Sequence, residues 1–377
     1  MVKRACPICL RPSTRDGEAG LSPAQPERAR PSEASGGRGD GEEPRVWKPS
    51  QGFHVHDGKE HSACSQSLYG SASPPKLDVG LGDVERLAIE TVNRRLALTG
   101  VQRKLSLSFA GSDADRRLTI VGALGGSHIL KPPAPEYPGM PEIEHWTMVL
   151  GRASGLRTAE AGLILLSSGE PAFITRRFDR DGVRRIHVED LCQLSGLATE
   201  HKYRSSMEKV GTLVRDLATA PGDDALRLFE VTVFSFLVGN SDMHLKNWTL
   251  VRDAGRAVLS PAYDLLPVRL LVDDPEEFAL PINGRKNRLE RRDFEALGKH
   301  LKIPDVVVQR TLDDLPARLT LAIKQLPSPW VAPEQAQVFR ALVTRNAARL
   351  AHGRKAGVTP RTPVVKKPAK RRSRPRP

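Results

Sequence analysis

One stretch, residues 239–247, constrains this chain more than any other. It follows an apolar run at 231–238, and inside it Asp242 and Asn247 lie five positions apart. This layout is typical of a phosphotransfer catalytic loop, in which one carboxylate receives the proton of the acceptor hydroxyl and an amide plus a later carboxylate hold Mg²⁺. Asp264 is available as the later carboxylate. The stretch therefore predicts an ATP-dependent phosphotransferase, whose other parts must come from elsewhere in the chain.

Each polar side chain of this loop has a predicted role. Asp242 is expected to accept the proton of the attacking hydroxyl. Asn247 and Asp264 are expected to bind Mg²⁺, and Lys246 to stabilise the transferred group. His244 is also a candidate catalytic residue, and we expect it to orient the loop through a hydrogen bond rather than to take part in the reaction. An ordinary surface turn uses the same Gly, Asn and Asp residues, so the prediction depends on matching groups upstream.

A lysine at the end of a predicted strand supplies the first matching group. The segment 127–131 ends in Lys131, which is placed for the α- and β-phosphates of ATP. The helix that follows offers Glu144 as the ion-pair partner that orients Lys131, with Glu142 as a competing candidate. A turn before the strands adds backbone N–H groups and another ammonium to the predicted phosphate site. Its residues are Gly100, Gln102 and Lys104.

A charged cluster follows the last predicted strand of the first half of the chain. Arg177, Asp179 and Arg180 lie where a two-lobed kinase has its adenine-binding hinge, which makes Arg177 and Asp179 candidate nucleotide-binding residues. A solvated salt-bridge cluster between two lobes is the alternative, and it is compatible with the first role.

The order of the predicted elements indicates an α+β fold. Apolar/polar alternation predicts strands in the first half, and helical periodicity dominates afterwards. Strands first and helices later are typical of two packed lobes, a small β-rich one at 81–176 and a mainly helical one at 177–352. The predicted strands cover 105–109, 117–121, 127–131, 163–166, 172–175, 248–251 and 257–259, and the main predicted helices cover 142–150, 188–196, 205–219, 223–238 and parts of 290–352.

Residues 1–70 carry two short metal-binding patterns. Cys6 and Cys9 form a C-x-x-C pair, and His61 and Cys64 form an H-x-x-C pair. Three thiolates and one imidazole are enough to close a tetrahedral structural Zn²⁺ site. We therefore expect these four residues to form a zinc-knuckle-like segment.

The residues between the two pairs bear on that prediction. Positions 13–51 are rich in Pro, Ser, Gly, Arg and Glu, a composition that predicts a disordered insert. A redox-active C-x-x-C pair is one alternative, although no strand–helix context accompanies it. In another alternative His54 or His56 replaces His61 as the ligand. Disulfides are disfavoured in a reducing cytosol.

Charge is distributed unevenly along the 377 residues. The formal net charge is +14, yet ten Lys and Arg residues lie between 354 and 376, where no acidic residue occurs. The tail, 353–377, is therefore predicted to be disordered, and either binds nucleic acid or acidic partners or merely improves solubility. No apolar run is as long as a membrane span, and no export signal opens the chain. We expect a cytoplasmic protein with no membrane partner.

Six stretches occur in an order that matches a known family. They resemble HipA-type serine/threonine kinases, the toxins of bacterial type II toxin–antitoxin systems. The resemblance implies an ATP·Mg²⁺-dependent protein kinase with a fold related to phosphoinositide kinases. It also implies Asp242 as the catalytic aspartate, Lys131 as the ATP lysine, and Asn247 and Asp264 as metal ligands. The stretches are 99–106, 128–132, 177–180, 187–193, 239–247 and 262–266.

The resemblance also implies partners. The usual family partner is a small helix-turn-helix antitoxin of the HipB type, through which DNA is contacted indirectly, and family substrates include aminoacyl-tRNA synthetases. The segment before Leu81 is too short for the extra β-rich subdomain of longer members and resembles the zinc-knuckle start of compact members. In compact members that subdomain can be a separate small protein, which makes such a protein a further candidate partner. Thr99 is the candidate autophosphorylation site, because Ala97 lacks a hydroxyl.

Two other readings use the same residues. In one, an inert kinase fold serves a nucleic-acid-binding protein that depends on zinc and on the basic tail. The complete set of Lys131, Asp242, Asn247 and Asp264 argues against an inert fold. In the other, the same core phosphorylates a small molecule.

Overall fold

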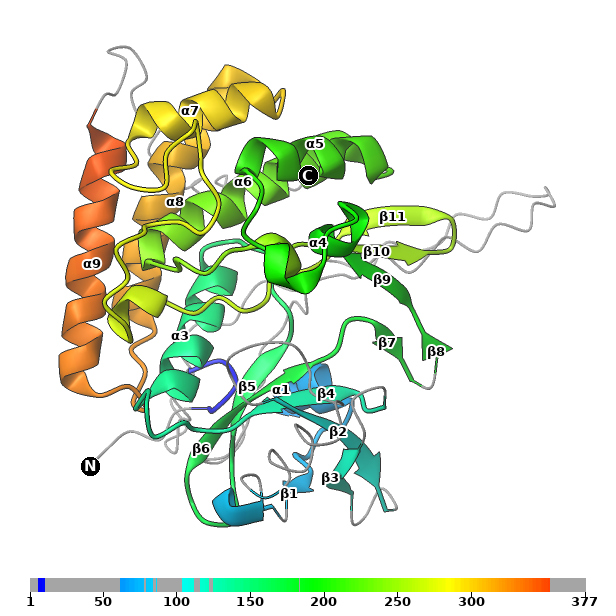
Figure 1. The fold of residues 1–377 in the computed structure, drawn as a ribbon. Helices are drawn as coiled ribbons and strands as arrows, with labels where there is room; N and C mark the ends of the chain where they lie inside the picture. Colours follow the sequence, from blue (N-terminus) through cyan, green and yellow to red (C-terminus); the bar gives the residue numbers. More distant parts are fainter. Residues whose placement is uncertain are drawn as a thin grey trace, which may run out of the picture.

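The computed structural model describes a β-rich lobe and a helical lobe (Figure 1). The order of elements confirms the predicted α+β fold. Several sequence predictions fall outside the described residues, namely His61, Thr99, Gly100, Gln102, the insert at 13–51 and the tail at 353–377. The described residues are 6–10, 62–77, 79–83, 86, 104–111, 116–121, 125–182 and 184–352.

The small lobe is built on a six-stranded sheet with the order β1-β3-β2-β4-β6-β5. All neighbouring strands are antiparallel except β1 and β3. Alternate residues such as Leu107, Leu130 and Ile174 are fully buried, as the sequence alternation predicts. The elements are α1 (Ser62–Tyr69), β1 (Lys76–Leu77), β2 (Leu105–Ala110), β3 (Arg117–Val121), β4 (His128–Lys131), α3 (Met140–Ala153), β5 (Ala161–Leu165) and β6 (Pro171–Arg176).

Helix α3 joins the two lobes. It packs on β5 and β6 on one side and on α8 on the other. Trp146, fully buried on α3, donates a hydrogen bond from Nε1 to the Leu326 carbonyl at 2.8 Å, just after α8. Because apolar packing and a buried hydrogen bond both fix α3, a side chain on this helix has a defined position relative to both lobes.

The large lobe is mainly helical and occupies the upper part of Figure 1. A three-stranded sheet with the order β11-β10-β9 lies at its side. Its elements are β7 (Arg180–Asp181), β8 (Arg184–Arg185), β9 (His187–Asp190), α4 (Leu191–Leu194), η2 (Thr199–His201), α5 (Met207–Leu217), α6 (Pro221–Val238), η3 (Leu245–Asn247), β10 (Thr249–Asp253), β11 (Arg256–Leu259), η4 (Val268–Leu270), α7 (Arg291–His300), α8 (Asp305–Gln325) and α9 (Pro333–Ala351).

The prediction of one helix over 188–196 is wrong in its first part. Residues 187–190 form strand β9, which pairs antiparallel with β10, and only 191–194 are helical. Asp190 ends the strand and caps α4, accepting a hydrogen bond from the Gln193 N–H at 2.9 Å. Pairing with a strand about sixty residues later decided this segment, and local periodicity carries no information about such a partner.

Helix α6 leads directly into the stretch that the sequence singled out. Its C-terminal half is buried on all sides against α5, α8 and α9. It ends at Gly239, whose φ of 73° is a left-handed cap. A Cβ at this position would lie 2.6 Å from Leu342 Cδ2, so the cap requires glycine both for its backbone angle and for space. The loop therefore starts from a rigid, buried helix end.

None of the helices in the described part of the chain combines the length and the apolar character that crossing a bilayer requires.

Candidate active site

A buried ion cluster lies where the small lobe meets the segment after β11. Lys131, the last residue of β4, donates hydrogen bonds from Nζ to Glu144 Oε1 on α3 and to Asp264 Oδ1. Lys104, just before β2, adds a contact of 3.3 Å to the second Asp264 oxygen. Lys131 and Glu144 are both buried. The structure thus brings together four predicted residues, Lys104, Lys131, Glu144 and Asp264, and the partner of Lys131 on the helix is Glu144 rather than Glu142.

Opposing effects set the charges in this cluster. Burial alone would raise the pKa of Asp264, but Lys104 and Lys131 outweigh it and hold this pKa well below its usual range. Burial would lower the pKa of Lys131, yet Asp264 and Glu144 raise it. Burial raises the pKa of Glu144 despite the attraction of Lys131. A pKa below its usual range keeps the Asp264 carboxylate ionised at neutral pH.

Asp264 is also held in an unusual backbone conformation. Its φ is 55°, a left-handed angle that costs a non-glycine residue roughly 1–2 kcal/mol. Its carbonyl accepts a hydrogen bond from Asn240 Nδ2 at 3.0 Å, and the Asn240 Oδ1 accepts one from the Asp242 N–H at 3.3 Å. The buried amide of Asn240 thereby connects the two acids. Sequence reasoning assigned Asn240 no role, although an Asn directly after a helix-ending Gly is a recognisable turn signal.

Asp242 lies on the open side of the same loop. Tyr203 donates a hydrogen bond from Oη to Asp242 Oδ1 at 2.7 Å, and His244 Nε2 lies 3.8 Å from Oδ2. The rings of Tyr203 and His244 meet edge to face at 5.3 Å. Burial lowers the pKa of His244 and outweighs the attraction of Asp242. A neutral His244 beside Asp242 agrees with an orienting role, and Tyr203 is a neighbour that no sequence motif indicated.

Lys246 and Asn247 occupy the short helix η3 that closes the loop. Lys246 donates a hydrogen bond from Nζ to Asp190 Oδ2 at 2.6 Å, so the ammonium is anchored to the residue that caps α4. Tyr263 donates from Oη to the Lys246 carbonyl at 2.7 Å, which fixes η3 against the residue that precedes Asp264. Asn247 is buried. The loop is therefore attached to both flanking segments.

The charged cluster after β6 forms tight contacts of its own. Arg177 binds Asp179 through two hydrogen bonds of 2.9 and 2.7 Å, and Arg180 Nη1 contacts the same carboxylate at 2.6 Å. Burial would raise the pKa of Asp179, but the hydrogen bonds from Arg177 and the charges of both arginines lower it. The ring centroids of Phe178 and Tyr263 lie 5.5 Å apart. The cluster thus links the sheet to the segment that carries Asp264.

The donor groups fit a hard divalent cation. Mg²⁺ prefers oxygen ligands, usually one or two carboxylates together with phosphate oxygens and water. Asp264 supplies an ionised carboxylate and Asn247 an amide oxygen, both on segments fixed by buried contacts. The ammonium groups of Lys104 and Lys131 beside Asp264 carry the positive charge that phosphate oxygens require.

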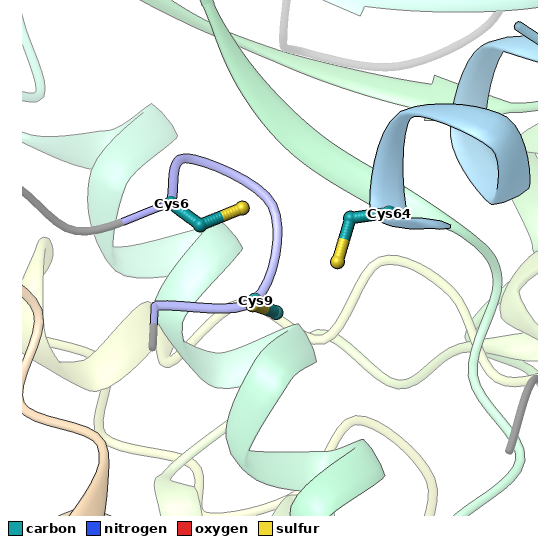
Figure 2. Close-up of side chains that lie close together, drawn as sticks. All are labelled: Cys6, Cys9 and Cys64. Carbon is teal, nitrogen blue, oxygen red and sulfur yellow. The ribbon is translucent and has the colours of Figure 1, made fainter. Parts of the chain in front are cut away.

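A second group of predicted residues lies between the turn at 6–10 and α1. The sulfur atoms of Cys6, Cys9 and Cys64 all lie within 4.8 Å of one another (Figure 2). The pairing of the two cysteine patterns therefore occurs as the sequence predicts, and His61 falls just outside the described residues.

The β-rich lobe and the helical lobe, with this ion cluster where they meet, define a kinase-like fold. Residues 96–323 match the family model described as the HipA-like C-terminal domain, and the chain belongs to that family. A solved structure of the HipA toxin from Shewanella oneidensis MR-1, in complex with HipB and operator DNA, superposes with a TM-score of 0.57 at 22% identity, over 71% of this chain and 70% of that one. At this identity the likeness shows the fold alone.

Curated relatives agree with the family. Two proteins of Sinorhizobium fredii that are named as kinases, Y4mE and Y4dM, are 33% and 36% identical over 233 and 205 residues, which cover 59% and 51% of this chain. The serine/threonine-protein kinase toxin HipA of Shewanella oneidensis is 26% identical over 257 residues, 62% of this chain and 57% of that protein. The chain spans about half the length of the curated relatives it matches.

Proposed function

We propose that this protein is an ATP- and Mg²⁺-dependent protein serine/threonine kinase that acts as the toxin of a HipBA-like toxin–antitoxin system. The observation that carries the proposal is the contact of Lys131 with both Glu144 and Asp264. Lys131 and Glu144 come from consecutive elements of the small lobe, and Asp264 comes from a segment 133 positions after Lys131. Burying the charges of Lys131 and Glu144 costs several kcal/mol of desolvation that pairing only partly offsets. Such an arrangement is what nucleotide binding requires, and packing alone gives no reason for it.

In this proposal the small lobe, which joins α1 and β1 to the predicted range 81–176, covers the nucleotide. Lys131 and Lys104 bind phosphate oxygens, and Glu144 keeps Lys131 oriented toward them. Asp264 and Asn247 are the ligands of Mg²⁺. When bound, ATP supplies the transferable phosphoryl group, and Mg²⁺ supplies a divalent charge that offsets the negative charge developing on the phosphoryl oxygens. Thr99, Gly100 and Gln102 keep their predicted roles as autophosphorylation site and phosphate-binding turn.

The large lobe, 177–352, presents the acceptor side. Asp242 accepts the proton of a serine or threonine hydroxyl as that oxygen attacks the γ-phosphate. The hydroxyl of Tyr203 already donates to this carboxylate at 2.7 Å, which supports the view that a second hydroxyl can reach it. His244 orients the loop, and Lys246 stabilises the transferred group once it exchanges its contact with Asp190. Arg177 and Asp179 border the adenine.

Substrate and partners follow from the family in this proposal. The acceptor is a component of the translation apparatus in the cytoplasm, such as an aminoacyl-tRNA synthetase. The partner is a HipB-like helix-turn-helix antitoxin that contacts DNA, and the support for it is the HipA complex with HipB and operator DNA from Shewanella oneidensis. A separate small protein that corresponds to the β-rich subdomain of longer family members is a further partner.

Asp242→Asn tests the activity. Wild-type protein, incubated with Mg²⁺, γ-labelled ATP and a bacterial lysate, is expected to label at least one protein on serine or threonine. Asp242→Asn is expected to lower this labelling by at least roughly a hundredfold, because the loop loses its proton acceptor. Asp216→Asn is the matched control, since Asp216 is an exposed carboxylate on α5, and it is expected to label as the wild type does.

Two results contradict the proposal. One is a wild-type protein that labels nothing above the level seen without Mg²⁺, and the other is equal labelling by Asp242→Asn. Label found in a metabolite rather than in protein would reject the protein-kinase assignment and favour a small-molecule kinase. Acid hydrolysis of the labelled product separates these outcomes, because it identifies phosphoserine and phosphothreonine.

A further inference from the structure

Three cysteine side chains converge between the turn at 6–10 and the first turn of α1. Cys6 and Cys9 come from a tight turn at 6–10, and Cys64 comes from the first turn of α1. Figure 2 shows the Cys6 and Cys64 side chains directed into the space between the turn and the helix, with Cys9 beside it. The turn is closed by a hydrogen bond from the Leu10 N–H to the Cys6 carbonyl at 2.9 Å. Two segments distant in sequence thus present thiols to one point.

The spacing of the sulfur atoms fits a metal ion. With Zn–S bonds of about 2.3 Å in a tetrahedron, the sulfur atoms of a zinc site lie about 3.8 Å apart. The three sulfur atoms here all lie within 4.8 Å of one another. A disulfide would use two of them and leave the third thiol inside the apolar cluster around Leu68 and Leu77. A soft divalent cation uses all three, which is why thiolate sites of this kind select zinc.

The turn at 6–10 contacts the elements that carry the candidate active site. The Pro7 carbonyl accepts a hydrogen bond from the Leu163 N–H of β5 at 2.9 Å. The Ile8 carbonyl accepts one from His145 Nε2 on α3 at 3.1 Å. Gly162 on β5 lets the turn and α1 approach the strand closely, because a Cβ at this position would lie 2.9 Å from the Leu68 side chain and 3.1 Å from the Ile8 side chain. The cysteine turn, α1, β5 and α3 are therefore packed together.

The position of His145 connects the two sites. It directly follows Glu144, the partner of Lys131, on the same helix. The turn at 6–10 buries Cys6, Ile8 and Leu10 in the apolar clusters of the protein, where each is at most 2% exposed. A cross-link between Cys9 and Cys64 would close a loop of about 55 residues and remove much of the conformational entropy of the unfolded chain. A metal bound to the three thiolates supplies such a cross-link.

We propose that Cys6, Cys9 and Cys64 bind one Zn²⁺ ion, which fastens the turn at 6–10 and α1 to β5 and α3 and so positions the helix that carries Glu144. On binding, the three thiols release their protons and the sulfur atoms become ligands. The fourth ligand predicted from the sequence, His61, lies outside the described residues and is tested separately. The proposed zinc site does not depend on the kinase proposal. Only the functional importance of positioning Glu144 rests on the proposed kinase activity.

Metal analysis tests the site itself. Wild-type protein is expected to hold one zinc per chain by elemental mass spectrometry, and Cys6→Ser, Cys9→Ser and Cys64→Ser are each expected to lose at least nine-tenths of it. Cys192→Ser is the matched control. Cys192 is buried on α4, where its thiol contacts the Leu197 and Ala198 carbonyls. The Cys192→Ser protein is therefore expected to retain its full zinc content. His61→Ala reports the fourth ligand: loss of zinc assigns it, and full retention assigns the position to another group.

Cobalt keeps the test valid if a variant fails to fold. Wild-type protein stripped of metal with a chelator and titrated with Co²⁺ is expected to show a thiolate-to-cobalt absorption band that saturates at one equivalent. Wild-type protein that contains no zinc and gives no such band overturns the proposal. So does zinc content that is unchanged in all three variants. An intact mass lighter by two hydrogens, which indicates a disulfide, overturns it as well.

Hydrogen exchange tests the connection to α3. Removal of the metal is expected to speed amide exchange in α3 (Met140–Ala153) at least tenfold, while α5 (Met207–Leu217) in the large lobe stays unchanged. Unchanged exchange in α3 would reject the positioning role even if zinc is present. None of these measurements uses ATP, so their failure is distinguishable from failure of the kinase proposal.

Discussion

Two acids of the candidate active site, Asp264 and Asp242, differ in their charged neighbours and in their exposure. Asp264 has a side chain that is 27% exposed, its carboxylate contacts the ammonium groups of Lys131 and Lys104, and its backbone carbonyl accepts a hydrogen bond from the Asn240 amide. Asp242 has a side chain that is 48% exposed, and its neighbours are Tyr203 and His244, neither of which carries a fixed positive charge. The difference matches the proposed tasks, because a group that holds cofactor must be positioned in advance, whereas a group that meets an incoming hydroxyl must stay accessible.

This contrast has a consequence for mutagenesis. A charge in the buried cluster supports both stability and activity, because removing it leaves an uncompensated partner in a dry site. A charge on the open loop is solvated, so removing it alters activity with little effect on the free energy of unfolding. Measuring both quantities for the same variants separates the two regions.

Lys131→Met is expected to have the largest effect. It leaves Glu144, which is fully buried, without its charged partner, and such a loss costs about 3–5 kcal/mol of unfolding free energy. Phosphorylation is expected to fall at least roughly a hundredfold, because an electrostatic contact to the phosphates is lost. Urea denaturation and the labelling assay measure the two effects.

The double variant Lys131→Met, Glu144→Gln serves as the control for that experiment. Replacing the carboxylate by an amide removes the unpaired charge, so part of the lost stability is expected to return while activity stays low. Equal instability of the single and double variants would show that the ion pair does not determine stability, and the contrast between the two acids would fail.

His128, at the start of the strand that ends in Lys131, predicts a pH effect on the small lobe. Burial lowers the pKa of His128 to about 4, assisted by the charges of Arg176 and Arg116 and opposed by its hydrogen bond to the Leu68 carbonyl. The folded protein therefore binds fewer protons here than the unfolded chain between pH 6.5 and pH 4. This contribution to stability is complete above pH 6.5 and is lost as pH falls through that window, by about 3 kcal/mol in total.

Denaturation at several pH values checks this prediction. His128→Gln retains a donor for the Leu68 carbonyl but has no proton to gain, so its stability is expected to fall less between pH 7 and pH 4.5, by about 2–3 kcal/mol, than that of the wild type. Parallel curves for the two proteins would mean that His128 does not contribute to acid sensitivity. Protonation of His128 affects the contact between α1 and the small-lobe sheet. Asp264 stays ionised in this pH window because its pKa lies well below the window.

Tyr203→Phe is expected to have the smallest effect. The change removes only the hydroxyl that donates to Asp242 and retains the ring that packs on His244. Unfolding free energy is expected to change by less than about 1 kcal/mol, and phosphorylation to fall severalfold and less than about tenfold, because the carboxylate loses one orienting contact. A loss as large as that of Asp242→Asn would assign Tyr203 a direct part in the reaction, and an increase would show that its hydroxyl competes with the acceptor.

The two regions also differ in how far sequence reasoning could describe them. Spacing within the loop singled out Asp242, Asn247 and Asp264, and strand periodicity placed Lys131 at the end of its strand. These are local patterns with a fixed chemical meaning. The neighbours Tyr203 and Asn240 were missed, because a single tyrosine or asparagine without a motif has many ordinary explanations.

Long-range pairing explains the other differences. Residues 188–190 form a strand and not a helix because β10 pairs with them. Lys246 contacts Asp190, a partner 56 positions away that no spacing rule indicates. The choice of Glu144 over Glu142 depends on which face α3 turns toward the sheet, and that face is set by its packing on β5, β6 and α8.

By itself, the sequence predicted most of the strands and helices, the residues of the candidate loop and the cysteine pairs, because periodicity, capping and ligand spacing act over a few residues. Only the tertiary structure decided that Lys131, 133 positions from Asp264, lies against it and that Cys64 meets Cys6 and Cys9 beside α3. Burial of apolar surface determines which distant segments meet, and this free energy depends on the whole packed core rather than on any one stretch of the chain.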